Sequence, residues 1–377
     1  MKNLYLILSS IILSVLTFFL VYKQLFTNAY ESDTFEHVIF LYRYIYEDGF
    51  YIAHPLWHIS SFIISKLLFI PVQYGAIIAS VFYVVLWYIL VYLFIKHKLH
   101  SKFNTATLVS LSIITIIIGP LCIPWYNHVI FFGQGSPNTW HNVTLWTVKP
   151  FALLSVWFIL DGLNQKNKNL LFWGILFTLI SIFAKPSFII MFLPALLIYA
   201  FALKIYKDRT FIITYGILGL LSIAILLYQY THTFNQEEGK IIIDFLGVWS
   251  LSSPNILISI FLALAFPLLF TILKTDILND RYILISWIMI FISIVYYATF
   301  AQSGRFYSHG NFGWSYIIAM SLLYLFSIVK FCKIFYTLLP IKRYFLIIIL
   351  LLQVIIGIYY FIHILMGQNP LYIAIFL

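Results

Sequence analysis

The chain has 377 residues, of which 63% are hydrophobic and 9% are charged, and its mean hydropathy is +1.00. Because a soluble globular domain usually carries about 25% charged residues, this composition excludes an ordinary soluble protein and predicts one that resides in a membrane. The net charge of +10 does not indicate nucleic-acid binding, since the lysines and arginines form short clusters between apolar runs, as membrane topology places them.

Eleven apolar runs are candidates for helices that cross the membrane, since a crossing of about 30 Å takes roughly 17 to 25 apolar residues. They lie near 4–22, 74–95, 105–124, 144–161, 170–185, 187–203, 211–229, 255–273, 282–300, 315–335 and 344–364. The first run is longer than a signal-peptide core and no cleavage site follows it before Lys23, so we expect an uncleaved anchor. We predict an all-α polytopic membrane protein with about eleven transmembrane helices in a single domain, residues 1–377.

A further apolar run at 55–70 is short and is interrupted by polar residues. If it does not cross, the inward loops hold 15 of the 22 lysines and arginines. If it crosses, the clusters around Lys98, Lys207 and Lys333 face outward, against the positive-inside rule. We therefore predict a juxtamembrane helix at 55–70, an inside amino terminus and an outside carboxyl terminus. The outward loops are then 23–73, 125–143, 230–254 and 301–314.

The first outward loop contains two predicted interfacial helices. The segment SDTFEHVIFLYRYIYEDG predicts an amphipathic helix that begins at an N-cap, Ser32 or Asp33, and ends near Gly49. One face of roughly 120° carries its polar side chains, which are Asp33, Glu36, His37, Arg43 and Glu47. The following segment, YIAHPLWHISSFIISKLLF, predicts the second helix. The polar face of the first helix is either simply solvated or directed at a polar ligand.

The order of these segments resembles the GT-C superfamily of integral-membrane glycosyltransferases, in particular the protein O-mannosyltransferases and the lipid A aminoarabinose transferases. In that family a first crossing leads to an acidic motif, often Asp-Glu, and then to two juxtamembrane helices separated by a glycine and a His-Pro or Lys-Pro pair. The matching stretches are SDTFEH, EDGF, AHPLWH, KHKLHSK, GSPNTWHNVTLWTVKPFALL and FAKPSFIIMFLPALL. The resemblance covers roughly residues 1–205, and 206–377 would be variable carboxyl-terminal helices.

Two departures from the family pattern concern acidic residues. Thr34 stands where the family often has the second acid of Asp-Glu, and GSPNTWHN lacks the acid that the second outward turn often carries. These departures leave metal binding open. We assign no metal-binding residues and no definite cofactor, and a divalent cation is the alternative.

The resemblance implies a glycosyltransferase that moves a sugar from a polyprenyl-phosphate donor to a lipid, glycan or protein acceptor on the outer face of the cytoplasmic (inner) membrane. Such a transfer needs a base that takes the acceptor proton and cations that stabilise the departing phosphate. Asp33 is the expected base by position and by resemblance, and Glu36 and His37 are the further candidate catalytic residues.

Candidates for binding the donor phosphate lie outside the inward clusters, where a charge near hydrocarbon indicates function. They are Arg43, His54, Lys66, Lys185 and Arg305. Lys149 and Lys185 each precede a proline and could either reach the outward cavity or snorkel to the surface. Candidates for acceptor or sugar binding lie in SPNTWHN and AQSGRFYSHGNFGW and are His141, Asn142, His309, Asn311 and Trp314. Either segment could instead be a helix start or an aromatic loop at the interface.

Two other functions are compatible with the sequence. A polymerase of surface polysaccharide repeat units, such as O-antigen, capsule or exopolysaccharide, also uses lipid-linked sugars and outward loops. A flippase or transporter of a lipid-linked precursor would be expected to have charges deep in several crossings and discontinuous helices. The crossings here are nearly uncharged apart from Lys149 and Lys185, which disfavours an ion-coupled carrier.

Overall fold

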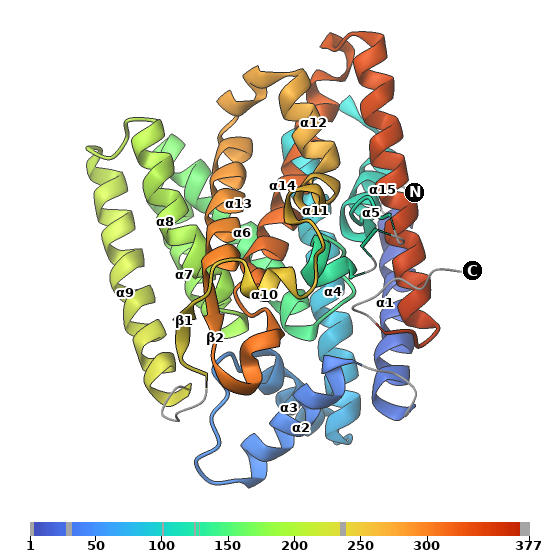
Figure 1. Ribbon diagram of the computed structural model, residues 1–377, viewed down its shortest axis with the longest axis vertical. Helices are drawn as coiled ribbons and strands as arrows, with labels where there is room; N and C mark the ends of the chain where they lie inside the picture. The colour runs from blue at the N-terminus through green and yellow to red at the C-terminus, as the bar shows by residue number, and fades with distance from the viewer. Residues whose placement is uncertain are drawn as a thin grey trace.

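The computed structural model describes residues 4–27, 32–99, 102–123, 126–127, 129–233 and 239–369, apart from the side chains of Phe132, Thr233 and Arg305. The first half of the chain (Figure 1) contains α1 (Leu4–Phe26), α2 (Asp33–Tyr46), α3 (Leu56–Leu68), α4 (Val72–Leu99), α5 (Thr105–Ile117), the π-helix η2 (Ile130–Gln134), α6 (Val143–Gln165), α7 (Lys168–Ala184) and α8 (Ser187–Ala202). The second half contains α9 (Arg209–Thr233), β1 (Ile241–Ile243), α10 (Gly247–Ser250), α11 (Ile256–Ala263), α12 (Ala265–Leu273), η3 (Thr275–Asn279), α13 (Arg281–Thr299), β2 (Phe300–Gln302), η4 (Gly304–His309), α14 (Gly313–Ile334), η5 (Phe335–Thr337) and α15 (Pro340–Leu365).

Seven of the described helices are long and apolar enough to cross a membrane: α1, α4, α6, α9, α13, α14 and α15. An eighth crossing results if α11 and α12, which meet at 79°, form one bent span. The described helices therefore agree with the predicted all-α polytopic membrane protein. The predicted count of eleven crossings is not confirmed.

The shortfall comes from the lengths of three helices. All eleven apolar runs form helices, but α5 has 13 residues, α8 has 16 and α7 has 17. At a rise of 1.5 Å per residue these helices measure roughly 20 to 26 Å, less than the hydrocarbon thickness. An apolar run does not show where its backbone leaves the helix, and the run at 105–124 leaves it at Ile117.

The segment between α1 and α4 begins and ends at the same end of the bundle. The two helices are antiparallel neighbours, because the Ser9 and Tyr88 hydroxyl oxygens are 2.6 Å apart near one end. Near the other end the ring centroids of Phe26 and Tyr74 are 5.5 Å apart. Figure 1 shows α2 and α3 below the bundle in this view. The run at 55–70 therefore does not cross, as the charge pattern predicts.

Helix α2 begins at the predicted N-cap. The Ser32 hydroxyl oxygen accepts a hydrogen bond of 3.1 Å from the backbone N–H of Thr34, which satisfies one of the free donors of the first turn. The helix ends at Tyr46, and Gly49 follows with φ +79°, a conformation in which a side chain would be strained. Val38 and Leu41 are buried, so the apolar face packs on the bundle as the helical wheel predicts.

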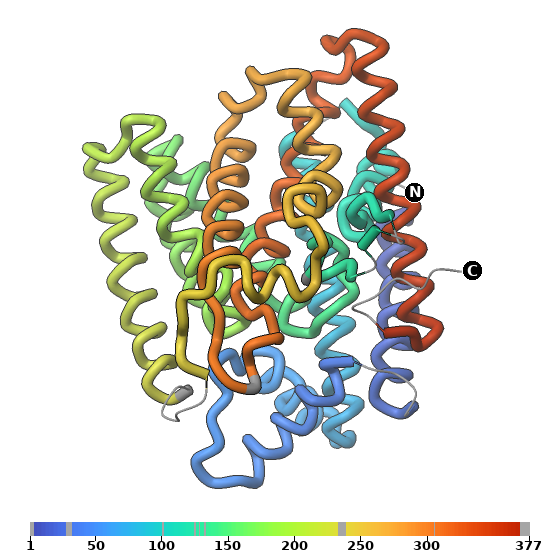
Figure 2. Tube along the Cα trace, viewed as in Figure 1, coloured from blue at the N-terminus to red at the C-terminus, as the bar shows by residue number. Residues whose placement is uncertain are grey.

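The turns predicted to be inward lie at the upper end of the bundle in this view, and α2 and α3 lie at the lower end (Figure 2). At the upper end in this view, Lys98 Nζ at the end of α4 is 2.8 Å from Asp161 Oδ2 near the end of α6. At the lower end, β1 and β2 form an antiparallel pair in which Ile242 lies opposite Ala301. The positive clusters that set the predicted orientation therefore share one end of the molecule.

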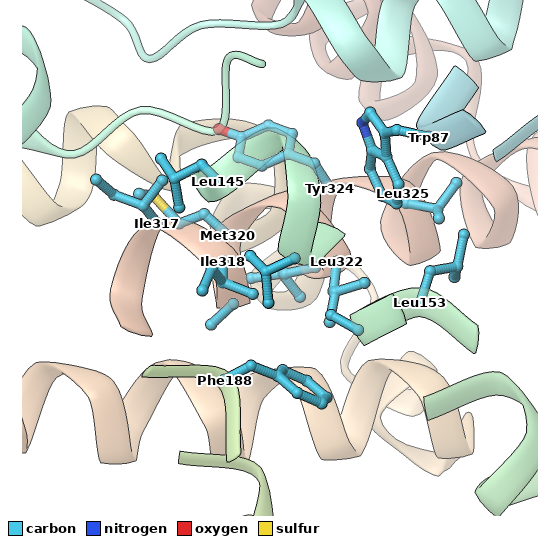
Figure 3. Close-up of a cluster of buried hydrophobic side chains, with 14 of the residues drawn as sticks. Trp87, Leu145, Leu153, Phe188, Ile317, Ile318, Met320, Leu322, Tyr324 and Leu325 are labelled. Atoms are coloured by element: carbon cyan, nitrogen blue, oxygen red, sulfur yellow. The ribbon is translucent and has the colours of Figure 1, made fainter. Parts of the chain in front are cut away.

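Helices α6 and α14 form the centre of the bundle. Side chains of α14 pack against α4, α6 and α8, and the labelled residues in Figure 3 are Trp87, Leu145, Leu153, Phe188, Ile317, Ile318, Met320, Leu322, Tyr324 and Leu325. Interior packing of this kind holds helices together in lipid, where burial from water contributes little between helices. By contrast, α1, α9 and α15 expose most of their apolar side chains, as expected for a lipid-facing periphery.

Irregular backbone connects α5 to α6 and is tied to the surrounding helices. Backbone outside helices is tolerated at membrane depth only where protein groups satisfy its polar atoms. Here the Asn138 side-chain amide donates to the carbonyl oxygen of Gly357 at 3.2 Å. The Trp249 indole N–H donates to the carbonyl oxygen of Gly133 at 3.0 Å. A Cβ at Gly357 would lie 2.0 Å from the Ile117 carbonyl oxygen, so only glycine permits this approach of α15 to the end of α5.

Candidate functional site

The carboxylate of Asp33 meets the start of α6, although the two lie 109 residues apart in sequence. Asp33 is exposed in the first turn of α2, where the helix dipole favours a negative charge. The Asn142 side-chain N–H donates to Asp33 Oδ2 at 2.7 Å. The Asn142 side-chain oxygen accepts from the backbone N–H of Thr144 at 2.9 Å and caps α6. One amide therefore begins a helix and orients the predicted base.

Lys185 contributes a buried cation to the same region. It lies between α7 and α8, where Pro186 follows and interrupts the helix. Its Nζ donates to Thr144 Oγ1 at 2.8 Å and lies 4.4 Å from the ring centroid of Trp314, at cation–π distance. Asp33 lies within electrostatic range of this ammonium. In the part of the chain that the structure describes, no carboxylate lies within ion-pair distance of Lys185.

His141 lies within electrostatic range of both Asp33 and Lys185. Its ring stacks on Phe131 with centroids 3.7 Å apart, and its Nδ1 is 3.2 Å from the Tyr360 hydroxyl oxygen of α15. Burial lowers the pKa of His141 to about 4, although the nearby Asp33 carboxylate opposes this shift. The imidazole is therefore neutral at pH 7 and suited to exchange hydrogen bonds with a polar ligand rather than to carry positive charge.

Three further histidines come together where α2 contacts α3. His37 Nδ1 is 3.2 Å from Nε2 of the fully buried His58, and the ring centroids of His37 and His54 are 6.4 Å apart. The Trp57 indole N–H donates to the Ser80 hydroxyl at 3.1 Å and fixes α3 on α4. Burial lowers the pKa of each of the three histidines. The Lys185 ammonium lowers the pKa of His54 and His37 further, and charge on a neighbouring histidine does so for all three. All three are neutral at pH 7.

Acidification should therefore destabilise the protein through this histidine group. Each folded-state pKa lies below the unfolded value of about 6.5, so the unfolded chain binds more protons as the pH falls. The stability contributed by the neutral rings is complete above pH 6.5 and is lost progressively below it. We expect the melting temperature in detergent to fall between pH 7 and pH 5, and to fall less in His58→Phe. The exposed His309→Gln is the control, and equal pH dependence in His58→Phe and the unsubstituted protein would contradict this account.

Three predicted residues of the first outward loop lie apart from these contacts. Arg43 Nε is 2.8 Å from Glu47 Oε2 on the exposed face of α2, and its guanidinium lies 4.1 Å from the ring centroid of Phe50. Lys66 is exposed at the end of α3. Glu36 is exposed on α2, and in the described ranges it makes no hydrogen bond or ion pair. The structure therefore does not bring Arg43, Lys66 or Glu36 into contact with the site.

The predicted outward loop 301–314 contributes Trp314 to the site directly and Asn311 through a hydrogen bond to Trp314. The Trp314 indole N–H donates to the Asn311 side-chain oxygen at 3.3 Å, which helps to orient the ring under Lys185. His309 is exposed and contacts Phe306 edge to face at 5.4 Å. Arg305 lies in η4, and its side chain is outside the described residues.

Lys149 takes neither of its two predicted positions. It is 1% exposed, and its Nζ donates to the carbonyl oxygens of Pro137 and Asn138, each at 3.1 Å. The cation therefore neither snorkels to the surface nor faces the cluster of Asp33 and Lys185. It supports the irregular backbone that precedes α6, a role that the sequence did not indicate.

Several contributors to the site were not selected from the sequence. Thr144 binds Lys185, while Phe131 and Tyr360 hold His141. Tyr360 comes from the last helix, and no local pattern could have found it. His58 follows His54 by one helical turn within AHPLWH, and this i, i+4 spacing is the one signal that was present.

The site as a whole combines an exposed carboxylate, a buried ammonium, an aromatic ring and a neutral imidazole. Across the described part of the chain, no group of three or more His, Cys, Asp or Glu side chains could hold a metal ion. An anion could bind to Lys185 while a hydroxyl approaches Asp33, and the buried ring of Trp314 lies against the Lys185 ammonium. No protein-family model matches the chain, and no curated protein matches it.

Proposed function

We propose that the protein is a GT-C-type membrane glycosyltransferase that takes sugar from a polyprenyl-phosphate donor and transfers it to a lipid, glycan or protein acceptor. In this proposal the end of the bundle that carries α2 and α3 faces outward from the cytoplasmic membrane. The amino terminus is then inside and the carboxyl terminus outside, in keeping with the distribution of positive charge.

The observation that carries the proposal is the approach of Asp33, Asn142, Lys185 and Trp314 from four separate segments at one end of the bundle. A general base and a phosphate-binding cation are the two groups that sugar transfer from a phosphate donor requires. Asp33 takes the proton of the acceptor hydroxyl, and Lys185 stabilises the negative charge that forms on the leaving phosphate. Trp314 holds the ammonium by cation–π attraction.

The test is sugar transfer by the purified full-length protein in detergent or nanodiscs with radiolabelled polyprenyl-phosphate sugars as donors. Label that moves from the donor to an added lipid or glycan acceptor supports the proposal. Absence of transfer from every donor offered, in a preparation with a cooperative thermal transition, would count against it.

Replacing Lys185 with glutamine should lower kcat/KM for the donor by about 10- to 100-fold, since a hydrogen bond to a charged group contributes roughly 1.5–3 kcal/mol. Lys185→Arg should retain part of the activity because it keeps the charge. The exposed Lys66→Gln is the matched control and should leave kcat/KM unchanged. A larger loss in Lys66→Gln than in Lys185→Gln would assign the phosphate to α3 instead.

A flippase for a lipid-linked precursor is the second candidate, and the broken helices favour it. The 79° bend between α11 and α12 and the early end of α5 are the discontinuities that transporters use around a substrate site. The buried charge of Lys149 does not favour a flippase, because its ammonium is bound to backbone carbonyl oxygens. Movement of a fluorescent lipid-linked sugar across vesicles without sugar transfer would favour the flippase. Growth of oligosaccharide chains on the lipid would favour a repeat-unit polymerase.

A further inference from the structure

A basic recess lies at the opposite end of the bundle from the candidate site. It is a small recess of about 20 Å³ between α4, α13 and α14. Three lysines line it together with a single carboxylate, that of Asp280, and its walls include aromatic rings. The lysines are Lys98, Lys330 and Lys333, and the rings are Phe94, Tyr282 and Phe326.

Positive charge around the recess exceeds the negative charge available to neutralise it. Asp161 already accepts hydrogen bonds from Lys98 Nζ at 2.8 Å, the Tyr282 hydroxyl at 2.7 Å and the Trp157 indole at 3.1 Å. Asp280 is paired with Lys330 at 3.2 Å.

Lys333 is the cation that remains. It is exposed, and among the residues with described positions no carboxylate lies within ion-pair distance of it. Lys102 is within electrostatic range of Lys333, and Arg281 is within electrostatic range of Lys98. Five cations thus share two carboxylates, and their mutual repulsion favours binding of an anion.

The positive-inside rule accounts for lysines at this end of the molecule but not for their convergence. Two other lysines at the same end each have an acid: Lys166 Nζ is 3.1 Å from Asp208, and Lys274 Nζ is 2.8 Å from Asp276. Lys98, Lys330 and Lys333 instead converge on one recess, and a bound anion would reduce their mutual repulsion.

We propose that the recess binds the phosphate group of an anionic ligand. Lysine ammonium groups bind phosphate as point charges, and basic pockets between transmembrane helices are a recurring form of lipid headgroup site. The ligand is either a phospholipid headgroup or a soluble phosphorylated compound. Its phosphate would lie at the mouth of the recess, beside the exposed Lys333, because the aromatic rings of the walls are buried. The site is independent of the proposed sugar transfer.

The variants that test the recess are Lys333→Gln and the double variant Lys330→Gln with Lys333→Gln. Lys333 forms no ion pair in the described structure, so its single replacement should leave the melting temperature unchanged. The matched control is Lys204→Gln with Lys207→Gln, which removes two exposed lysines from the same end but outside the recess. Each lysine near a phosphate contributes about 1 kcal/mol. We therefore expect binding about fivefold weaker in the single variant and about tenfold or more weaker in the double variant.

The measurement is native mass spectrometry of the full-length protein in detergent, titrated separately with phosphatidylglycerol and with pyrophosphate. Lysine-dependent retention of phosphatidylglycerol alone assigns the recess to a lipid headgroup. Lysine-dependent binding of pyrophosphate alone assigns it to a soluble ligand. If the double variant binds both probes as well as the control variant does, or if the unsubstituted protein binds neither, the proposal is overturned. Sugar transfer is not measured, so this result does not depend on the proposed function.

Discussion

Replacing Asp33 with asparagine should lower the rate of sugar transfer at saturating donor and acceptor by about 100-fold or more. General base catalysis typically contributes 10²- to 10⁴-fold, and an amide cannot take the acceptor proton at neutral pH. Asparagine has nearly the same shape, and its side-chain oxygen can still accept the hydrogen bond that Asn142 donates to Asp33 at 2.7 Å. The loss should therefore appear in kcat, with little change in KM or in melting temperature.

Two carboxylates of the same loop provide the controls for this experiment. Asp48→Asn removes an exposed acid that follows α2, and Glu36→Gln removes the exposed acid one helical turn after Asp33. Both variants should transfer sugar at close to the unsubstituted rate. Full activity in Asp33→Asn would sink the assignment of this base, and a selective loss in Glu36→Gln would move the role to Glu36.

Replacing Lys149 with methionine should lower the free energy of unfolding by about 1–3 kcal/mol. Methionine has a similar length, so the main loss is of the two hydrogen bonds from Nζ to the carbonyl oxygens of Pro137 and Asn138. A buried polar group left without a partner destabilises a protein by about 1–3 kcal/mol. Pro137 keeps one partner, because the Ser321 hydroxyl donates to the same carbonyl oxygen at 3.2 Å. The Asn138 carbonyl oxygen loses the hydrogen bond that Lys149 donates to it.

Unfolding by heat and by denaturant in detergent measures this effect. Lys207→Met is the control, since it replaces an exposed lysine at the other end of the bundle and should change the melting temperature little. An equal melting temperature for Lys149→Met and Lys207→Met would show that the irregular backbone before α6 does not depend on the buried ammonium.

The charge pattern predicted that 55–70 does not cross, in agreement with the structure, whereas the eleven crossings that hydropathy predicted are not confirmed. The loops at the Lys98 end all carry positive clusters. This pattern does not depend on the lengths of the helices that connect the loops. Helix α5 is shorter than the apolar run that predicts it. It ends at Ile117, inside the run, next to the close packing of Gly119 on Gly357. Contacts of that kind join residues far apart in sequence, so no window of the sequence contains them.

The structure brings together three residues that the sequence singled out, but their partners were not singled out. Asp33 was selected by position and by the family resemblance, Asn142 for its place in SPNTWHN, and Lys185 as a cation outside the inward clusters. Arg43 was selected on the same ground as Lys185, but it is paired with Glu47 one turn along the same helix. This i, i+4 pair was visible in the sequence and could have lowered the expectation for Arg43.

The two ends of the Asn142 amide have different partners, and the difference fixes which way the amide faces. The backbone N–H of Thr144 can only donate, so the side-chain oxygen must point toward it and the NH₂ group must point toward Asp33. Turning the amide over would uncap α6 and would place an oxygen against a carboxylate. The first turn of α6 and the direction of the donor that meets Asp33 are therefore set by the same side chain, before any substrate arrives.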